Sequence, residues 1–215
     1  MLHPIKCIRT SGVAVALAGL LALATDGSAA VLISVDMDPA TVGIQSTRLG
    51  SSGDPFTADL VMTVGAEGVS SYSVSANFDT TELMLDGSPA ASYPVLPGGL
   101  TPVPPAPSED NALGRVWSFN GVTFGTGPSL TSFVFGSIKF KVTTPVTNLS
   151  EDVTPGFFNL PGSIDSMFDN AGNPIVPTFA GGTVNVVPEP GSAALLVLGA
   201  CVSGALIRRR VRGPV

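Results

Sequence analysis

Oxygen-bearing side chains that could hold a metal ion gather in one stretch near the end of the chain. Asp165, Asp169, Asn170 and Asn173 fall in a segment whose glycine and asparagine predict a loop. Carboxylate and amide oxygens from loops are the ligands that Ca²⁺ prefers in proteins. The spacing departs from the EF-hand pattern, and Asp, Asn and Gly are also the ordinary residues of a turn. The turn is the favoured interpretation, and calcium is the one cofactor that the sequence leaves open.

The single tryptophan is a second residue with a recognisable use. An exposed Trp117 could stack against a sugar ring. Trp117 and Phe119 alternate along one expected strand and would share one of its faces. Aromatic side chains in a strand more often pack in a core. We therefore expect Trp117 in the core, with ligand stacking as the alternative.

Catalytic chemistry is hard to place in this chain. The only histidine is His3, and the only cysteines are Cys7 and Cys201, all within the terminal segments 1–30 and 188–215. The usual proton shuttle and the thiolate nucleophile are therefore missing from the central segment. A hydrolase could still use paired carboxylates, but the sequence distinguishes no pair among the many acids. The chain is expected not to be an enzyme.

The central segment reads as a series of strands. Apolar and polar residues alternate in six runs: Val31–Asp38, Thr57–Val64, Ser71–Asp79, Arg115–Phe119, Thr131–Thr143 and Gly182–Val187. A period of two is typical of a strand with one buried and one wet face. The 25 glycines and 19 prolines lie mainly between these runs, as turn residues. This pattern predicts an all-β, antiparallel β-sandwich, with Gly87–Pro107 as a long surface loop across one end.

The charge of the central segment excludes one class of partner. Of the 16 acidic residues only Asp26 lies outside residues 31–190, whereas six of the ten basic residues do, so this segment carries a net charge near −11. Such a surface repels nucleic acid, and nucleic-acid binding is rejected. Because both cysteines lie outside it, the segment must be stabilised by an apolar core rather than by a disulfide.

The N-terminus has the order of a secretory signal. Basic Lys6 and Arg9 precede an apolar run, Val13–Ala24, and small residues follow at Ser28–Ala30. This order predicts a signal helix over residues 1–30 that signal peptidase removes after Ala30.

The C-terminus predicts a membrane span. Residues Gly191–Ile207 contain no charge, and as a helix they would measure about 25 Å, near the lower limit for a span. A basic cluster follows, formed by Arg208, Arg209, Arg210 and Arg212. Basic flanks stay on the cytoplasmic side, so residues 31–187 are expected to face outward as one ectodomain.

The motif Pro188-Glu189-Pro190, followed by the apolar run and the arginine cluster, resembles the PEP-CTERM sorting signal of bacteria that make exopolysaccharide. The resemblance covers residues 188–215. It implies that an exosortase, a membrane protease, recognises the Pro-Glu-Pro region and cleaves the tail from the exported domain. An ordinary single-pass anchor is the alternative.

The ectodomain resembles cohesin-like domains in the order of its turns and strands. The segments on which the resemblance rests are the Gly53-Asp54 turn, Phe56–Val64, Tyr72–Phe78, Phe78–Leu83 and Asp169–Asn173. The resemblance implies a jelly-roll sandwich related to carbohydrate-binding modules. Gly87–Pro107 departs from the pattern, and no binding residue is carried over.

Together these features predict an exported, non-catalytic protein of the cell surface or exopolysaccharide layer, anchored transiently in the membrane and sorted by an exosortase. The alternative is a cohesin-like module that binds carbohydrate or another surface protein. Calcium could stabilise such a module.

Overall fold

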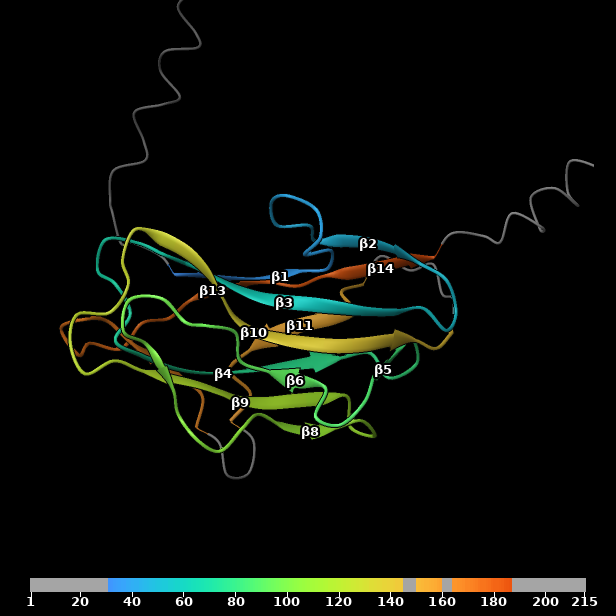
Figure 1. Cartoon of the computed structure of the whole chain (residues 1–215). Coiled ribbons are helices and arrows are strands. Elements are labelled where there is room, and N and C mark those ends of the chain that lie inside the picture. The colour runs from blue at the N-terminus through green and yellow to red at the C-terminus, as the bar shows by residue number, and fades with distance from the viewer. Residues whose placement is uncertain (1–30, 145–149, 160–163, 187–215) are drawn as a thin grey trace, which may run out of the picture.

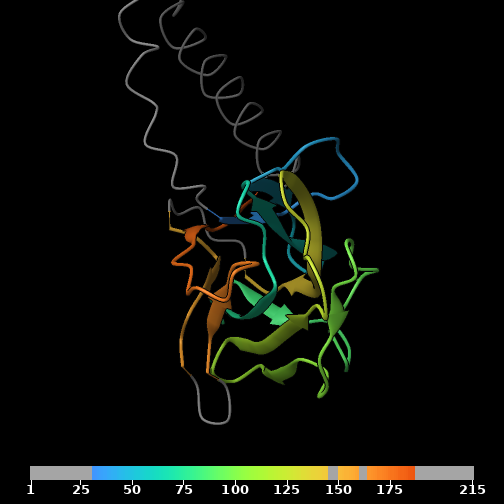
Figure 2. The ribbon, with the colours of Figure 1, turned by 90° about the vertical axis from the view of Figure 1, so that its left-hand side faces the viewer.

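The computed structural model describes residues 31–144, 150–159 and 164–186, and every regular element among them is a strand (Figure 1). Two sheets face each other across an apolar core, as the view along the layers also shows (Figure 2). The prediction of an all-β sandwich is confirmed. The predicted signal peptide (1–30) and the predicted sorting segment (188–215) lie outside the described residues.

The first sheet is built on the two longest strands. Its members are β1 (Leu32–Asp36), β3 (Pro55–Val64), β5 (Leu83–Leu85), β6 (Ala91–Ser92), β10 (Thr131–Val142) and β13 (Thr178–Ala180). Their order is β13-β1-β3-β10-β5, and β6 also pairs with β10. The pairs β1–β3 and β3–β10 are antiparallel, whereas β1 and β13 run parallel.

The second sheet forms the opposite layer. Its members are β4 (Ser71–Phe78), β7 (Thr101–Pro102), β8 (Ser108–Asp110), β9 (Arg115–Val122), β11 (Val153–Gly156) and β12 (Ser166–Phe168). The order is β11-β4-β9-β7, with β12 paired to β4 and β8 paired to β9. A separate ribbon joins β2 (Thr47–Gly50) to β14 (Thr183–Val186) in parallel. Two parallel pairs therefore depart from the purely antiparallel sandwich that was expected.

All six alternating runs of the sequence form strands, namely β1, β3, β4, β9, β10 and β14. Most of their apolar residues face the core as the period of two predicts, and Lys139 and Lys141 of β10 face outward. Aromatic rings join the two layers. Phe119 of the second sheet meets Phe135 of the first edge to face at 6.2 Å, and Tyr72 meets the same Phe135 at 5.3 Å.

Two β-bulges interrupt the alternation. In β9, Val116 pairs with Ala76 and Phe119 with Val74, so that Trp117 and Ser118 together oppose one residue of β4. Ser118 adopts a left-handed backbone conformation with φ of 68°. A second bulge in β10 inserts one extra residue between Val134 and Gly136. The extra residue in each strand resets which side chains face the core.

The segment Gly87–Pro107 is not the simple surface loop that the sequence predicts. It contributes β6 to the first sheet and β7 to the second, so it passes from one layer to the other. Ala90, Ala91 and Leu100 are buried, and Tyr93 packs against the core. Proline and glycine set the turns of this segment, but its few apolar residues still reach the core.

Candidate functional site

The four side chains that the sequence left open as a calcium site do not gather at one point. Asp165 precedes β12 and Asp169 follows it, so the two lie at opposite ends of this strand. The Asp169 carboxylate closes its own turn. It accepts hydrogen bonds from the backbone N–H groups of Ala171 (2.8 Å) and Asn173 (2.7 Å) and from the Asn173 side-chain amide (3.0 Å). These bonds with Asn173 hold the pKa of Asp169 below its ordinary value.

The other two candidates are also engaged in hydrogen bonds. The Asn170 side chain accepts from Gly127 N–H at 2.7 Å and donates to Gly127 C=O at 3.3 Å. Asp165 accepts from the hydroxyls of Ser73 (3.2 Å) and Ser75 (3.0 Å) and from the backbone N–H of Phe158 (2.8 Å). Across the described ranges, no three acidic, histidine or cysteine side chains converge as a metal site would require. The stretch is held as turns by its own side chains and neighbours.

Trp117 is half-buried, and it does not share a face with Phe119. The expectation that both face the core is wrong because the bulge at Ser118 adds a residue between them. Phe119 points inward, whereas Trp117 lies on the outer side of the second sheet, directly across from Ser108 of β8. Phe135, by contrast, is fully buried, as expected for a strand aromatic.

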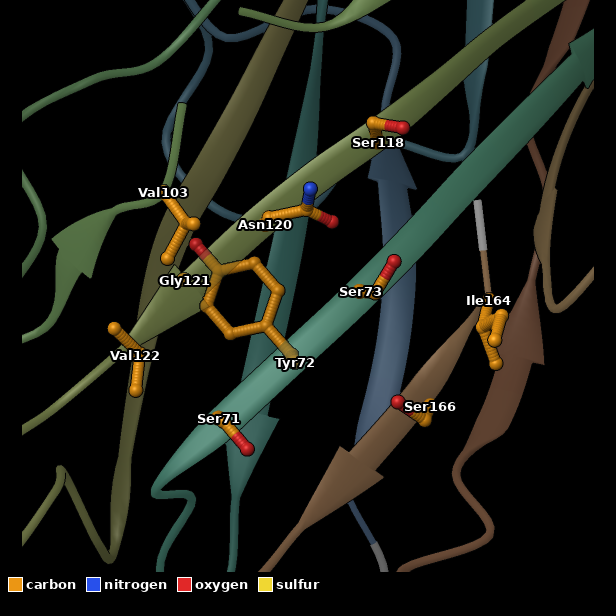
Figure 3. A pocket seen from close by; sticks show the side chains of 10 residues that line it. All are labelled: Ser71, Tyr72, Ser73, Val103, Ser118, Asn120, Gly121, Val122, Ile164 and Ser166. Atoms are coloured by element: carbon orange, nitrogen blue, oxygen red, sulfur yellow. The ribbon is translucent and has the colours of Figure 1, made fainter. Parts of the chain in front are cut away.

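A shallow groove crosses this same outer face (Figure 3). We call it the serine groove. It has a volume of about 280 Å³ and is lined by Ser71, Tyr72, Ser73, Val103, Ser118, Asn120, Gly121, Val122, Ile164 and Ser166. β4, β9 and β12 supply the serines and the asparagine, while Val103 and the exposed Ile164 stand at its sides. No residue of this lining is charged, although the Asp165 carboxylate lies beside it and accepts a hydrogen bond from Ser73.

Tyr93 fixes the strand that carries the groove. Its hydroxyl donates to the backbone C=O of Ser118 at 2.8 Å and accepts from the N–H of Asn120 at 2.8 Å. These two bonds bridge the bulge of β9, whose backbone groups there cannot all pair with β4. Sequence reasoning missed Tyr93 because it lies in the segment expected to be a loop. The residues Ser73 and Asn120 were missed because outward serines and asparagines are ordinary on a wet strand face.

Two polar atoms of the lining have no hydrogen-bonding partner among the described residues. They are the carbonyl oxygen of the Asn120 side chain and the hydroxyl of Tyr72, and both atoms are buried. Tyr72 is 3% exposed, and burial raises the pKa of its hydroxyl, which the nearby Tyr93 raises further. The phenol therefore stays neutral. Buried polar groups are normally satisfied, so such atoms often mark a place where water or a ligand completes the bonding.

The lining offers groups that form hydrogen bonds. It holds hydroxyls and a side-chain amide, and the Ser73 hydroxyl among them donates to the Asp165 carboxylate at 3.2 Å. The arrangement suits hydrogen bonds to a neutral, polar ligand.

No family model matches the chain, and no curated protein matches it. Solved structures with a similar backbone are cohesins, the family that the turn motifs resemble. The sixth cohesin of scaffoldin B from Acetivibrio cellulolyticus, solved with a Cel5 dockerin, is 16% identical, with a TM-score of 0.46, and covers 74% of this chain and 99% of that one. The cohesin–dockerin complex of OlpC from Clostridium thermocellum gives 11% identity and a TM-score of 0.48, covering 75% of this chain and 98% of that one.

A non-cellulosomal cohesin from the archaeon Archaeoglobus fulgidus is 15% identical, with a TM-score of 0.46, and covers 77% of this chain and 97% of that one. At these identities and scores, neither a shared family nor a shared function is established. The serine groove is therefore interpreted from its own residues.

The remaining predicted sites lie outside the described residues. These are the motif Pro188, Glu189 and Pro190 and the basic cluster Arg208, Arg209, Arg210 and Arg212. Within residues 31–144, 150–159 and 164–186, no helix is long and apolar enough to cross a membrane.

Proposed function

We propose that this chain is an exported, non-catalytic binding module, and that the serine groove is its ligand-binding surface. The observation that carries the proposal is the groove itself, a recess lined by hydroxyls and an amide, with a side-chain carbonyl oxygen that finds no donor within the described part of the chain. Leaving a buried acceptor unpaired costs about 1–3 kcal/mol, which a ligand donor would recover.

The ligand class that fits best is a neutral saccharide. Sugars present many hydroxyls, each of which can donate to Asn120 or accept from the serines. A volume of about 280 Å³ accommodates a small unit such as one sugar residue rather than a long chain. Trp117 lies beside the groove on the same face and could add a stacking contact, although it does not belong to the lining.

A surface protein is the second candidate ligand. Ile164 stands at the side of the groove and is 81% exposed, which would suit an apolar contact with a partner chain. A protein ligand would spread beyond the groove, so its affinity should depend on Ile164 more than on Asn120.

Export and sorting belong to the same proposal. The signal peptide would deliver the ectodomain outside the cell, where the C-terminal span and arginine cluster hold it until an exosortase cuts near Pro188-Glu189-Pro190. The module would then act at the cell surface or in the exopolysaccharide layer.

The binding proposal is tested with the exported protein purified from its host and the neutral exopolysaccharide of the same cells. Affinity electrophoresis should show that the polysaccharide retards the protein in a saturable way. Asn120→Ala should lower the affinity for the polysaccharide roughly tenfold, because one hydrogen bond of about 1–1.5 kcal/mol is lost. Asn185→Ala, in the β2–β14 ribbon, is the matched control. Equal binding by both variants would remove the serine groove from the proposal, whereas loss on Ile164→Ala alone would favour a protein ligand.

A further inference from the structure

A second groove lies on the opposite side of the sandwich, on the outer face of the first sheet. We call it the acidic groove. It has a volume of about 350 Å³ and is lined by Asp36, Pro39, Thr41, Val42, Gly43, Ile44, Asp59, Val61, Ser132, Phe133 and Val134. One wall is the loop between β1 and β2, which rises from the sheet in Figure 1. The other wall is the bulged part of β10.

The loop that forms the first wall is tied down, yet it holds apolar side chains in solvent. The Asp36 carboxylate accepts from the backbone N–H groups of Asp38 and Gln45, each at 3.1 Å, and Met37 N–H donates to Gln45 C=O at 2.7 Å. Val42 is nevertheless 98% exposed and Ile44 is 44% exposed. A fixed loop that presents apolar groups beside a recess has the form of a docking wall.

Two carboxylates form the polar part of the groove. Asp36 of β1 lies directly opposite Asp59 of β3 in the strand register. Like charges at such a position repel each other and destabilise the sheet. Burial raises the pKa of Asp59 and Asp36 raises it further, while the hydrogen bond from Ser137 at 2.6 Å acts in the other direction.

Neighbouring cations do not neutralise this pair. Lys139 and Lys141 share the outer face of β10, but they lie opposite Thr57 and Pro55, farther along β3. The one ion pair found among the described residues joins Arg48 to Asp38, at 3.6 Å. The groove therefore presents two carboxylates together with an apolar wall, and it lacks the positive charge that would balance them.

We propose that the acidic groove binds a peptide segment of a partner protein in which a lysine or arginine is flanked by apolar residues. The basic group would lie between Asp36 and Asp59, and its apolar neighbours would pack on Val42, Ile44 and Val134. Charge complementarity favours this occupant over a second copy of the chain, because two ectodomains near −11 repel each other. The inference concerns a different face from the serine groove and does not depend on it.

The test uses the exported protein and three peptides of the form GVXVG-amide, each labelled with fluorescein at its N-terminus, with X as lysine, glutamine or glutamate. Fluorescence anisotropy should show binding of the lysine peptide alone, weakening with added salt. Asp59→Asn should reduce that affinity about tenfold, because one member of a close charge pair is lost. Asp86→Asn makes the same charge change on an exposed turn after β5 and should leave the affinity within twofold.

Two further readouts separate binding from folding. Asp59→Asn should raise the melting temperature of the free protein, because it removes the repulsion from Asp36, so weakened binding cannot be attributed to unfolding. Val42→Ser, at a fully exposed position, should lower the affinity for the lysine peptide without changing the melting temperature. Equal binding of the lysine and glutamine peptides, no binding of any peptide, or an Asp59→Asn variant that binds like the original protein would each overturn the proposal. The proposal would also be overturned if the protein bound Ca²⁺ stoichiometrically through Asp59 and showed no preference among the three peptides.

Discussion

Two carboxylates, Glu82 and Asp152, are almost fully buried, at 2% and 1% exposure. Asp152 accepts a short hydrogen bond of 2.5 Å from the N–H of Val184 in the last strand, while its other carboxylate oxygen is buried without a partner among the described residues. Burial raises the pKa of both groups, and the Asp152 charge raises that of Glu82 further. In Asp152 the bond from Val184 opposes the shift. At this site the folded domain holds protons more tightly than the unfolded chain does.

This difference predicts that mild acidification stabilises the protein. A raised folded-state pKa gives a contribution to stability that is complete below the unfolded values, 4.5 for Glu82 and 3.8 for Asp152, and is lost as the pH rises through the folded values. Asp169 acts in the opposite sense, since its lowered pKa gives stability that is present above 3.8 and lost as the pH falls through its folded value. The free energy of unfolding should therefore increase as the pH falls from neutrality toward 4.5, the unfolded value of Glu82.

Urea denaturation at a series of pH values measures the effect. Glu82→Gln should flatten the rise above pH 4.5, because the titrating group is removed. Glu67→Gln, at an exposed turn between β3 and β4, serves as the control and should keep the slope. A slope unchanged by Glu82→Gln would show that other groups set the pH dependence.

At the scale of the elements, the bulges of β9 and β10 face each other across the core. Gly136 follows the extra residue of β10, and a β-carbon added there would lie 2.6 Å from the ring of Phe119 in β9. Phe119 is itself fully buried and held between Phe135 and Tyr93. The glycine therefore lets the two sheets approach where both strands are irregular.

We expect Gly136→Ala to lower the free energy of unfolding by about 1–3 kcal/mol, the usual cost of overpacking a core. Gly125→Ala is the control, because its added β-carbon would meet nothing within 4 Å and should change stability by less than about 0.5 kcal/mol. Urea midpoints of the two variants give the comparison. A neutral Gly136→Ala would mean that Phe119 can move aside freely.

The elements also show why sequence reasoning succeeded unevenly. Long strands such as β3 and β10 contain enough residues for a period of two to be read, whereas β6, β7 and β12 have two or three residues and no readable period. A bulge leaves no mark in the alternation, so Trp117 was expected on the wrong face. The serine groove could not be predicted, because it arises where β12 and the segment around Val103 come to flank β4 and β9.

For the whole molecule, the sorting proposal makes a prediction about mass. The protein recovered from the native cell surface should lack the residues before Val31 and the tail beyond the Pro188-Glu189-Pro190 region. Intact-mass spectrometry measures this directly. A strain without the sorting protease is the control and should retain Arg208–Val215. Retention of that tail in the normal host would make the chain an ordinary anchored protein.

The parallel pairing of β14 with β2 has a mechanical consequence. A pull applied to the C-terminal end of β14 along the strand axis acts against the pairing of β14 with β2. A strand pulled along its length beside a parallel neighbour loads its hydrogen bonds in shear, all at once, rather than opening them one after another. The bonds from Thr183 to Ser46 and from Val184 to Asp152 share that load. If the module is tethered at this end while its grooves hold a ligand, the hydrogen bonds along the whole of β14 would together resist the pulling force.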